Sequence, residues 1–423
     1  MIRMIEVLRY RCLQDICQQV GPFQVLVGPN ASGKSTFLDA VRLLGDLLDQ
    51  GVSAIQNRSG NFLNLLWMQR GDRFEVAVEI DIPREKQERL AKDNGYAQAR
   101  YEVAVGYAEK TRELAILGET LWLKPADSPA AAVPQGTSLS LFPAPKAPRD
   151  TIVLPEGKHA PRGWKKIVTK KSESGNDYFF SETTGWQSPF RIGPRKLALA
   201  NLPEDEDRFP VAIWTRRLLM EGIFKIVLNS ESMRRPAPPG TPIAFQPDGS
   251  NLPWAIETLR SANRAQFDRW IAHIRTALPD IVTIETVERP EDKHRYLQIE
   301  YKTGLKVPSW VVSDGTLRLL ALTLVAYLDE PQRIYLIEEP ENGIHPQAVE
   351  TVFQSLSSAY NSQIFCASHS PVVLSLAEPE QILCFARTGE GATDIVRGSE
   401  HPNLRDWKRG TDLGTLFASG VLG

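Results

Sequence analysis

Two stretches of the sequence carry side chains whose types and spacing suit phosphate chemistry. The first is GPNASGKST, residues 28–36, which fits the pattern GxxxxGK[ST] with Gly28, Gly33, Lys34 and Ser35 at the required places. In such a loop, backbone N–H groups surround the phosphates, the lysine reaches the outer phosphates and the hydroxyl can bind Mg²⁺. An apolar strand precedes the stretch and an amphipathic helix follows it, which favours a nucleotide-binding loop over a simple glycine turn.

The second stretch is YLIEEPENGIHP, residues 335–346, where an apolar strand runs into Glu338 and Glu339. Neighbouring carboxylates repel each other and resist burial, so their place at a strand end suggests a metal and water site. Glu338 would hold a water on Mg²⁺, and Glu339 would position or deprotonate the attacking water. A glutamate at the first position, where aspartate is usual, keeps the charge and adds one methylene. The alternative is a solvated strand end.

Two further groups follow the same logic. SQIFCASHSP, residues 362–371, is another apolar strand that ends in polar residues, and His369 would lie near the γ-phosphate as a hydrogen-bonding partner. Ser313, Asp314 and Gly315 open a strongly apolar helix whose first turn offers N–H groups and a hydroxyl. Either group alone fits an ordinary structural histidine or a capped core helix.

The elements that must position these residues follow from hydrophobic spacing. Alternating apolar residues predict strands at 1–11, 23–28, 73–82, 100–108 and 113–125, and helical spacing predicts helices at 35–49, 211–228 and 252–277. The last part alternates between the two types, at 294–302, 313–328, 333–337, 347–360, 362–368 and 381–387. This alternation predicts an α/β fold.

These four groups, in their order along the chain, resemble the ABC-type ATPase heads of the RecF, SMC and OLD group, the bacterial "AAA family ATPases" (AAA_21-like). The resemblance covers residues 1–83 and 295–423. It implies a P-loop NTPase core of ABC type with a mixed sheet, an antiparallel β lobe and a compact inserted α+β arm or lid at 84–294. The implied nucleotide-binding residues are Gly28, Pro29, Asn30, Ala31, Ser32, Gly33, Lys34, Ser35 and Thr36.

The resemblance also implies roles for the other groups. Glu338 stands at Walker B and on the metal, Glu339 is the catalytic glutamate, and His369 is the switch histidine. Ser313, Asp314 and Gly315 stand at the signature motif, which in this family contacts the γ-phosphate bound to the other subunit. ATP and Mg²⁺ are therefore the implied cofactors, and a head-to-tail ATP-sandwich dimer or larger homo-oligomer is the implied assembly. The chain departs from the family where it reads SDGT rather than SGGQ, and Gln69 is only a candidate for the metal-binding glutamine.

The inserted part contains a proline-rich stretch at 125–161 and then a basic and aromatic segment at 158–196. Basic and stacking side chains together suit a nucleic-acid surface. A charged hairpin face with aromatic residues beneath it explains the same pattern, so both interpretations stay open. The basic residues are Lys158, Arg162, Lys165, Lys166, Lys170, Lys171, Arg191, Arg195 and Lys196.

Composition indicates where the protein is located and which kinds of partner it can have. The net charge is −2 and the four cysteines form no CxxC pair, which fits reduced thiols in a cytoplasmic protein. No apolar run reaches the length of a membrane span, so a membrane partner is not expected. DNA binding would therefore need a local basic patch.

The leading functional hypothesis is a Mg²⁺-dependent ATPase that acts as an ATP-gated dimeric switch. We expect it to be the sensor or motor subunit of an anti-phage defence or DNA-repair module, with DNA as a candidate partner. OLD-type nucleases carry a Toprim domain after the head, but only 54 residues follow His369, without the expected acidic cluster. A separate effector encoded nearby, such as a nuclease, is therefore expected. The alternatives are an ATP-controlled scaffold that holds and releases a protein partner or toxin and, less well supported, the energy-coupling subunit of a transporter.

Overall fold

The computed structural model describes residues 1–90, 95–126, 147–154, 160–171, 177–241, 244–328, 332–359 and 361–401. Most of the proline-rich stretch, Lys158 and the C-terminal DLGTLFASGVLG lie outside these residues. The chain divides into two compact units. The first contains described residues within 1–21, 28–223 and 384–401, and the second those within 22–27 and 224–383. The division at 1–83, 84–294 and 295–423 stays a prediction.

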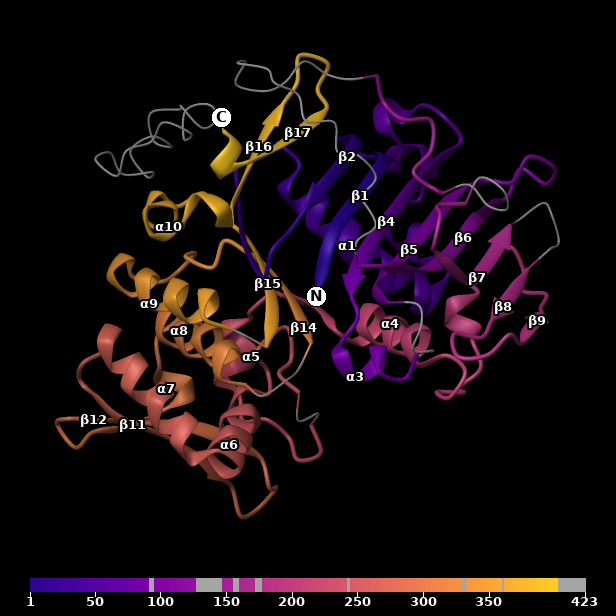
Figure 1. Cartoon of the computed structure of the whole chain (residues 1–423). Helices are drawn as coiled ribbons and strands as arrows, with labels where there is room; N and C mark the ends of the chain where they lie inside the picture. Colours follow the sequence, from indigo (N-terminus) through magenta and orange to yellow (C-terminus); the bar gives the residue numbers. More distant parts are fainter. Residues whose placement is uncertain are drawn as a thin grey trace. The chain divides into compact units, whose positions relative to one another are not determined.

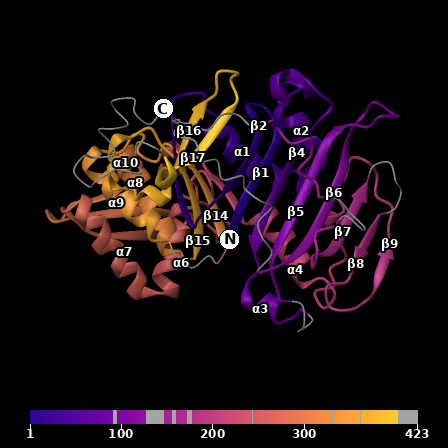
Figure 2. The same cartoon turned by 45° about the horizontal axis from the view of Figure 1, so that its top comes forward.

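An eight-stranded antiparallel sheet is the central element of the first unit (Figures 1 and 2). Its neighbouring strands pair in the order β2-β1-β4-β5-β6-β7-β8-β9. Their bounds are β1 Ile2–Tyr10, β2 Leu13–Gln19, β4 Arg73–Asp81, β5 Tyr96–Tyr107, β6 Leu114–Pro125, β7 Lys165–Lys171, β8 Tyr178–Phe180 and β9 Gln187–Pro189. β17 (Thr393–Arg397) lies beside β2 in the same unit.

Alternation along the strands gives this sheet one apolar and one charged face. In β4, Phe74, Val76 and Val78 alternate with Glu75 and Glu79, and all five are buried. Successive strand side chains point to opposite faces, so the carboxylates share the face opposite the aliphatic core. Helices α1 (Lys34–Gln50) and α4 (Pro210–Glu221) pack on each other, and α1 also contacts β1 and β4.

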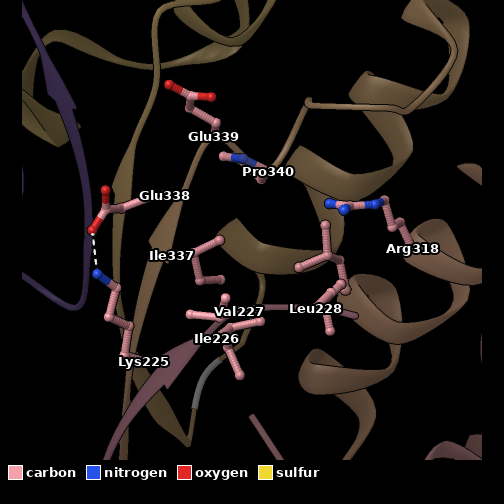
Figure 3. Close-up of a pocket in the computed structure, with 10 residues that line it drawn as sticks. Lys225, Ile226, Val227, Leu228, Arg318, Ile337, Glu338, Glu339 and Pro340 are labelled. Atoms are coloured by element: carbon pink, nitrogen blue, oxygen red, sulfur yellow. Dashed lines mark ion pairs between the residues drawn. The ribbon is translucent and has the colours of Figure 1, made fainter. Parts of the chain in front are cut away.

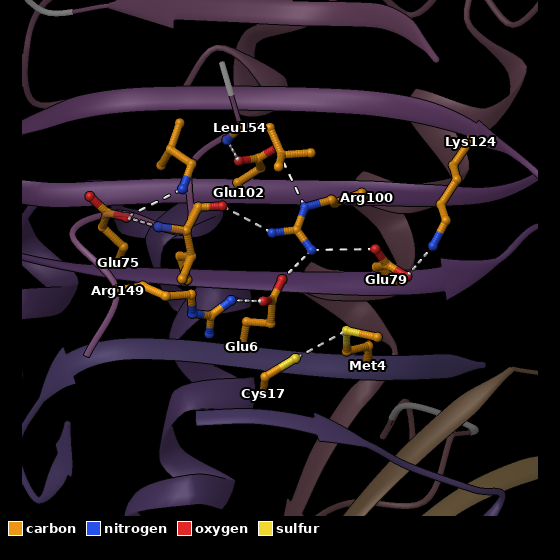
Figure 4. Close-up of polar contacts among 12 residues, drawn as sticks. Met4, Glu6, Cys17, Glu75, Glu79, Arg100, Glu102, Lys124, Arg149 and Leu154 are labelled. Atoms are coloured by element: carbon orange, nitrogen blue, oxygen red, sulfur yellow. Dashed lines mark hydrogen bonds and ion pairs between the residues drawn. The ribbon is translucent and has the colours of Figure 1, made fainter. Parts of the chain in front are cut away.

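Buried ion pairs stabilise the charged face (Figure 4). The Arg100 guanidinium is 2% exposed and pairs with Glu6, while its Nη1 lies 3.3 Å from Glu79 Oε1. Lys124 Nζ lies 2.8 Å from Glu79 Oε2. A buried carboxylate needs such partners, because an uncompensated charge in the interior is strongly destabilising.

The short segment that contains Ile152 and Leu154 lies against the charged face of the sheet. The backbone N–H groups of Ile152 and Leu154 donate to Glu75 Oε2 at 2.7 Å and to Glu102 Oε2 at 2.6 Å. Arg100 Nη2 in turn donates to the carbonyl of Ile152 at 3.0 Å. The carboxylates of the sheet therefore satisfy the backbone of the segment, and Ile152 packs with Leu8 and Ala77 of the sheet.

The second unit contains a parallel sheet. β14 (Arg333–Glu338) pairs in parallel with β15 (Ser362–Ala367), which pairs in parallel with β3 (Phe23–Val27). β10 (Ile223–Ile226), which begins one residue before this unit, lies on the other side of β14. The chain passes from the second unit back to the first inside β16 (Ile382–Arg387). β14 and β15 are almost wholly buried, as strands of a covered parallel sheet are.

Helices and a small sheet complete the second unit. α8 (Asp314–Leu324) packs on α9 (Pro346–Ser357), and α7 (Arg264–Ala277) contacts both. α6 (Leu252–Ala262) and α7 lie against an antiparallel sheet of β11 (Ile281–Glu288), β12 (Arg295–Tyr301) and β13 (Lys306–Pro308). The short helices α5 (Ser230–Arg234) and α10 (Pro371–Leu376) contact α8 and α9 respectively. No helix of the described ranges is long and apolar enough to cross a membrane.

Two predicted helices are wrong in extent. The helix predicted at 211–228 ends at Glu221, and residues 223–226 form β10, because Gly222 ends the helix and β-branched residues follow. The helix predicted at 252–277 is two helices, α6 and α7. Asn263 separates them, and its side chain accepts the N–H of Gln266 at 3.0 Å as the cap of α7.

Candidate nucleotide site

The loop of residues 28–33 has the conformation expected of a phosphate-binding loop. Lys34 begins α1 and is 6% exposed, and its ammonium donates to the carbonyls of Gly28 at 2.8 Å and Pro29 at 2.9 Å. The cap residue of α1 is Gly33, which has no side chain to accept the first N–H groups of the helix. A 17-residue helix that begins this way directs N–H groups and a positive dipole toward an anion.

Glycine is required at both ends of this loop. Gly33 has a φ of 106°, and a Cβ there would lie 2.2 Å from Thr393 Oγ1. Gly28 has a φ of 146°, and its Cβ would lie 2.2 Å from the carbonyl oxygen of Phe385. The Thr393 hydroxyl also donates to the carbonyl of Ser32 at 2.8 Å, so the beginning of β17 holds the backbone of the loop in place. Thr393 could not be found from local sequence patterns, because it lies 360 positions from Gly33.

The remaining residues of the loop lie at its rim. Pro29, Asn30 and Ala31 are exposed, as is Ser35 in the first turn of α1, whereas Ser32 is buried. Ala31 has a φ of 61°, a conformation uncommon for a residue with a side chain. The loop therefore presents backbone and a serine hydroxyl on its open side, which fits the triphosphate of a nucleotide.

In the second unit, Glu338 and Glu339 stand at the end of β14 and point in different directions (Figure 3). Glu338 Oε1 lies 2.8 Å from the ammonium of Lys225 on the neighbouring strand β10. Glu339 is exposed, has a φ of 49° and donates its N–H to the carbonyl of Ala367 at 2.7 Å. The turn at Glu339 separates the two carboxylates, and their two distinct roles stay a prediction.

A cavity of about 260 Å³ lies beside these carboxylates in the second unit. Lys225, Arg318, Glu338 and Glu339 supply its charged side chains (Figure 3). The remainder is apolar and consists of Ile226, Val227, Leu228, Leu322, Ile337 and Pro340. Lys225 was not predicted as a site residue, because the apolar spacing around it had indicated a helix. Arg318 was not predicted either, because it lies within the apolar pattern of α8.

The predicted signature residues lie at the beginning of α8. The Ser313 hydroxyl accepts the N–H of Thr316 at 3.3 Å as the helix cap, and both Ser313 and Asp314 are exposed. Asp314 forms an ion pair with Arg234 of α5. A Cβ on Gly315 would lie 2.7 Å from the carbonyl oxygen of Gly343, so this glycine allows α8 to approach the segment that follows Glu339.

His369 follows β15 and is half-buried. Its backbone N–H donates to Glu341 Oε1 at 3.2 Å, and the hydroxyl of Ser368 donates to the same oxygen at 2.7 Å. The structure therefore brings the end of β14, the residues after β15 and the beginning of α8 together within the second unit. Glu341 is a further residue of this site that the sequence analysis did not identify.

Gln69 lies in the first unit, in a 3₁₀ turn before β4. It is exposed and has a φ of 56°. The strand beside β14 is β10, so the polar side chain next to Glu338 is Lys225 rather than a residue that precedes β4. A metal-binding role for Gln69 stays a prediction without a structural contact to support it.

Some lysines of the basic and aromatic segment, residues 158–196, bind backbone carbonyls of the protein itself. Lys170 is 2% exposed and donates to the carbonyls of Gly193, at 3.0 Å, and Lys196. Lys165 donates to the carbonyl of Glu182 at 2.9 Å. Lys170 is therefore directed toward the interior rather than toward solvent, and the half-buried Lys165 has a backbone partner, while a nucleic-acid surface on this segment stays a hypothesis. Among the described residues of the segment, the exposed basic ones are Arg162, Lys171, Arg191, Arg195 and Lys196.

The chain matches a known protein family and, over a short stretch, one characterised relative. Residues 23–375 match the family described as "AAA domain, putative AbiEii toxin, Type IV TA system". A stretch of 48 residues is 46% identical to the OLD nuclease of Thermus scotoductus, and it spans 11% of this chain and 9% of that protein. The chain thus covers only a small part of that relative's length.

The fold is similar to that of solved Smc heads. A crystal structure of an Smc head bound to the C-winged helix domain of ScpA has a TM-score of 0.52 and 13% identity, over 93% of this chain and 96% of that one. An Smc head with an extended coiled coil, bound to the C-terminal domain of ScpA from Pyrococcus furiosus, has a TM-score of 0.48 and 12% identity, over 93% and 95% of the two chains. The first likeness and the family match confirm the predicted fold class.

Proposed function

The chain belongs to the AAA-domain family that matches residues 23–375, and it is an ABC-type ATPase of the RecF, SMC and OLD group. We propose that it is a Mg²⁺-dependent, ATP-gated dimeric switch. ATP would bring two copies together head to tail, and hydrolysis would release them. Each nucleotide would lie between the phosphate-binding loop of one copy and the beginning of α8 of the other.

The observation that carries this proposal is the exposed beginning of α8. Ser313 and Asp314 are exposed at the N-terminal end of an 11-residue helix, and this end packs against Gly343 in the segment after Glu339. The chain therefore exposes a second helix N-terminus besides that of α1, and there the Asp314 carboxylate is paired with Arg234, which offsets its charge. Two such ends on one chain supply what a head-to-tail pair needs for two composite sites.

The proposed roles follow from charge and reach. Lys34 would neutralise charge on the β- and γ-phosphates, and the exposed carboxylate of Glu339 would orient the attacking water. Ser35 and Glu338 are the residues that would hold Mg²⁺, which when bound supplies positive charge to the phosphate oxygens. His369 would hydrogen-bond the γ-phosphate, and Ser313 of the partner copy would complete the site.

Mixing two inactive variants tests the head-to-tail arrangement. Lys34→Ala and Ser313→Arg should each lack ATPase activity alone. A 1:1 mixture should regain about a quarter of the wild-type rate, because half of the dimers would be mixed and each would contain one intact composite site. A mixture as inactive as its components would refute the shared site, and the double variant on one chain, mixed with wild type, is the matched control.

The biological role that we propose is sensing or processing DNA in an anti-phage defence or repair module, with a separate effector such as a nuclease. The family description and the OLD nuclease match support this setting. Purification of the chain with the products of neighbouring genes, with and without ATP, tests it. Recovery of a nuclease only with ATP is the expected outcome, and recovery of the chain alone under both conditions counts against it.

A second candidate is an ATP-controlled scaffold that holds a protein partner. Leu305, Trp310 and Val311, which lie just before Ser313, are 60%, 51% and 66% exposed, and large exposed apolar residues favour a protein contact. The solved Smc head that this fold resembles is itself bound to a protein domain. Glu339→Gln separates the candidates: a scaffold should keep or tighten its partner, whereas a DNA-processing switch should lose activity and accumulate as an ATP-bound dimer.

A further inference from the structure

The carboxylate of Glu341 connects two loops that carry proposed catalytic residues. Glu341 lies two residues after Glu339, and its Oε1 accepts the Ser368 hydroxyl at 2.7 Å and the His369 N–H at 3.2 Å. Ser368 is fully buried, so its hydroxyl has a single well-defined environment. Two hydrogen bonds that converge on one carboxylate oxygen constrain the backbone of both donor residues.

The Ser368 hydroxyl extends this constraint past His369. Its oxygen accepts the N–H of Ser370 at 3.0 Å while its proton is donated to Glu341. His369 is therefore held at its own N–H and, through Ser368, at the N–H of the next residue. With the backbone fixed on both sides, the Cα–Cβ bond of His369 has a defined direction, from which the imidazole reaches out in one of its staggered rotamers.

The other side of the connection is equally ordered. The N–H of Glu339 donates to the backbone carbonyl of Ala367 at 2.7 Å, and the N–H of Ile344 donates to the backbone carbonyl of Glu341 at 3.1 Å. Ile344 is buried and anchors the segment after Glu339. The loop with the glutamate and the loop with the histidine thus meet at two places, one through backbone atoms and one through the Glu341 carboxylate.

We propose that Glu341 is a positioning residue that fixes His369 relative to Glu339 during ATP hydrolysis. The inference rests on the roles proposed above for Glu339 and His369. The side-chain hydrogen bonds of Glu341 go to Ser368 and to His369, so the effect that we propose is exerted through His369. A misplacement of about 1 Å in a catalytic group is enough to lower a rate about 100-fold.

A double-mutant cycle tests the proposal. Glu341→Ala should lower kcat about 10- to 100-fold, with the Kd for ATP changed less than about twofold. Glu341→Gln should recover most of the rate, because its amide oxygen can accept the same two hydrogen bonds. Combining Glu341→Ala with His369→Ala should be no slower than His369→Ala alone, since both changes remove one function. Glu350→Ala, at an exposed glutamate of α9, is the matched control.

Hydrogen exchange supplies a readout that does not depend on hydrolysis. In Glu341→Ala, the His369 and Ser370 amides should exchange faster, while the midpoint of urea unfolding moves little. Additive effects in the double variant, or a rate loss explained by unfolding alone, would overturn the proposal. A wild-type rate in His369→Ala beside a slow Glu341→Ala would overturn it too, whereas failure of the dimeric switch would appear separately in the mixing of Lys34→Ala with Ser313→Arg.

Discussion

The ammonium of Lys225 lies 2.8 Å from Glu338 Oε1, on the strand next to the one that ends in the two glutamates. Both side chains are about one-third exposed, so the pair is worth about 0.5–1 kcal/mol. The lysine competes for the carboxylate that we propose to act on the metal side. Lys225→Met should therefore lower the Mg²⁺ concentration for half-maximal ATPase activity about two- to fivefold.

Titration of Mg²⁺ at fixed ATP measures this effect, and Lys225→Arg is the control because it retains the positive charge. Urea unfolding of both variants shows whether the fold is intact. If Lys225→Met requires more Mg²⁺ than the wild type, the lysine orients Glu338 for the metal instead of competing with it, and this prediction is wrong.

The close contact behind the phosphate-binding loop makes a second prediction. Gly33→Ala should weaken ATP binding about 10- to 100-fold, because a φ of 106° is strained for alanine and the new methyl group would meet Thr393 Oγ1. Adding Thr393→Ala should restore only part of the affinity, since the clash is relieved but the strained φ remains. Fluorescent-nucleotide binding measures both. Full restoration would show that the clash alone is responsible.

Two adjacent lysines of β7 should respond differently to charge reversal. Lys170→Glu places a second carboxylate near the buried Glu119 and removes the donor to Gly193, so it should destabilise the protein by about 3–5 kcal/mol. Lys171→Glu, at an exposed position, should change stability by less than about 0.5 kcal/mol. Urea unfolding decides, and equal effects would contradict the inward orientation of Lys170.

The charged face of the first unit predicts a dependence of stability on pH. Burial raises the pKa of Glu102 from 4.5 to about 7, although Arg100 and the Leu154 N–H oppose the shift. The folded protein therefore keeps a proton on Glu102 that the unfolded chain releases, and this contribution to stability is lost as the pH rises from about 4.5 to about 7. A shift of this size corresponds to at most roughly 3 kcal/mol.

Glu102→Gln should remove that part of the dependence. The difference in unfolding free energy between wild type and Glu102→Gln, measured in urea at pH 5 and pH 7.5, should move in favour of the variant at the higher pH. Glu88→Gln, at an exposed position, should show no such change. A difference that does not vary with pH would mean that Glu102 is ionised throughout the range.

Local patterns predicted the fold class and the positions of most strands. The phosphate-binding loop was predictable because its chemistry requires fixed residue types within nine positions, between a strand and a helix. Glu338, Glu339 and His369 could be placed at strand ends because the apolar runs before them are short and clearly bounded. In these stretches local propensity and tertiary context agree.

The partners of these residues could not be predicted, because they come from distant parts of the chain. Lys225 is more than 100 positions from Glu338, Thr393 is 360 positions from Gly33, and no periodicity connects them. The inward orientation of Lys170 was hidden because its backbone partners, Gly193 and Lys196, leave no trace in residue type. Composition alone therefore made Lys170 look like a surface residue.

The mass of the protein in solution tests the central claim most directly. Light scattering of Glu339→Gln, which should bind ATP without hydrolysing it, should give about 95 kDa with ATP and Mg²⁺, twice the chain mass of 47.3 kDa, and the chain mass without nucleotide. Ser313→Arg in the same background should stay at the mass of one chain. A mass that is the same with and without ATP would contradict an ATP-gated dimer.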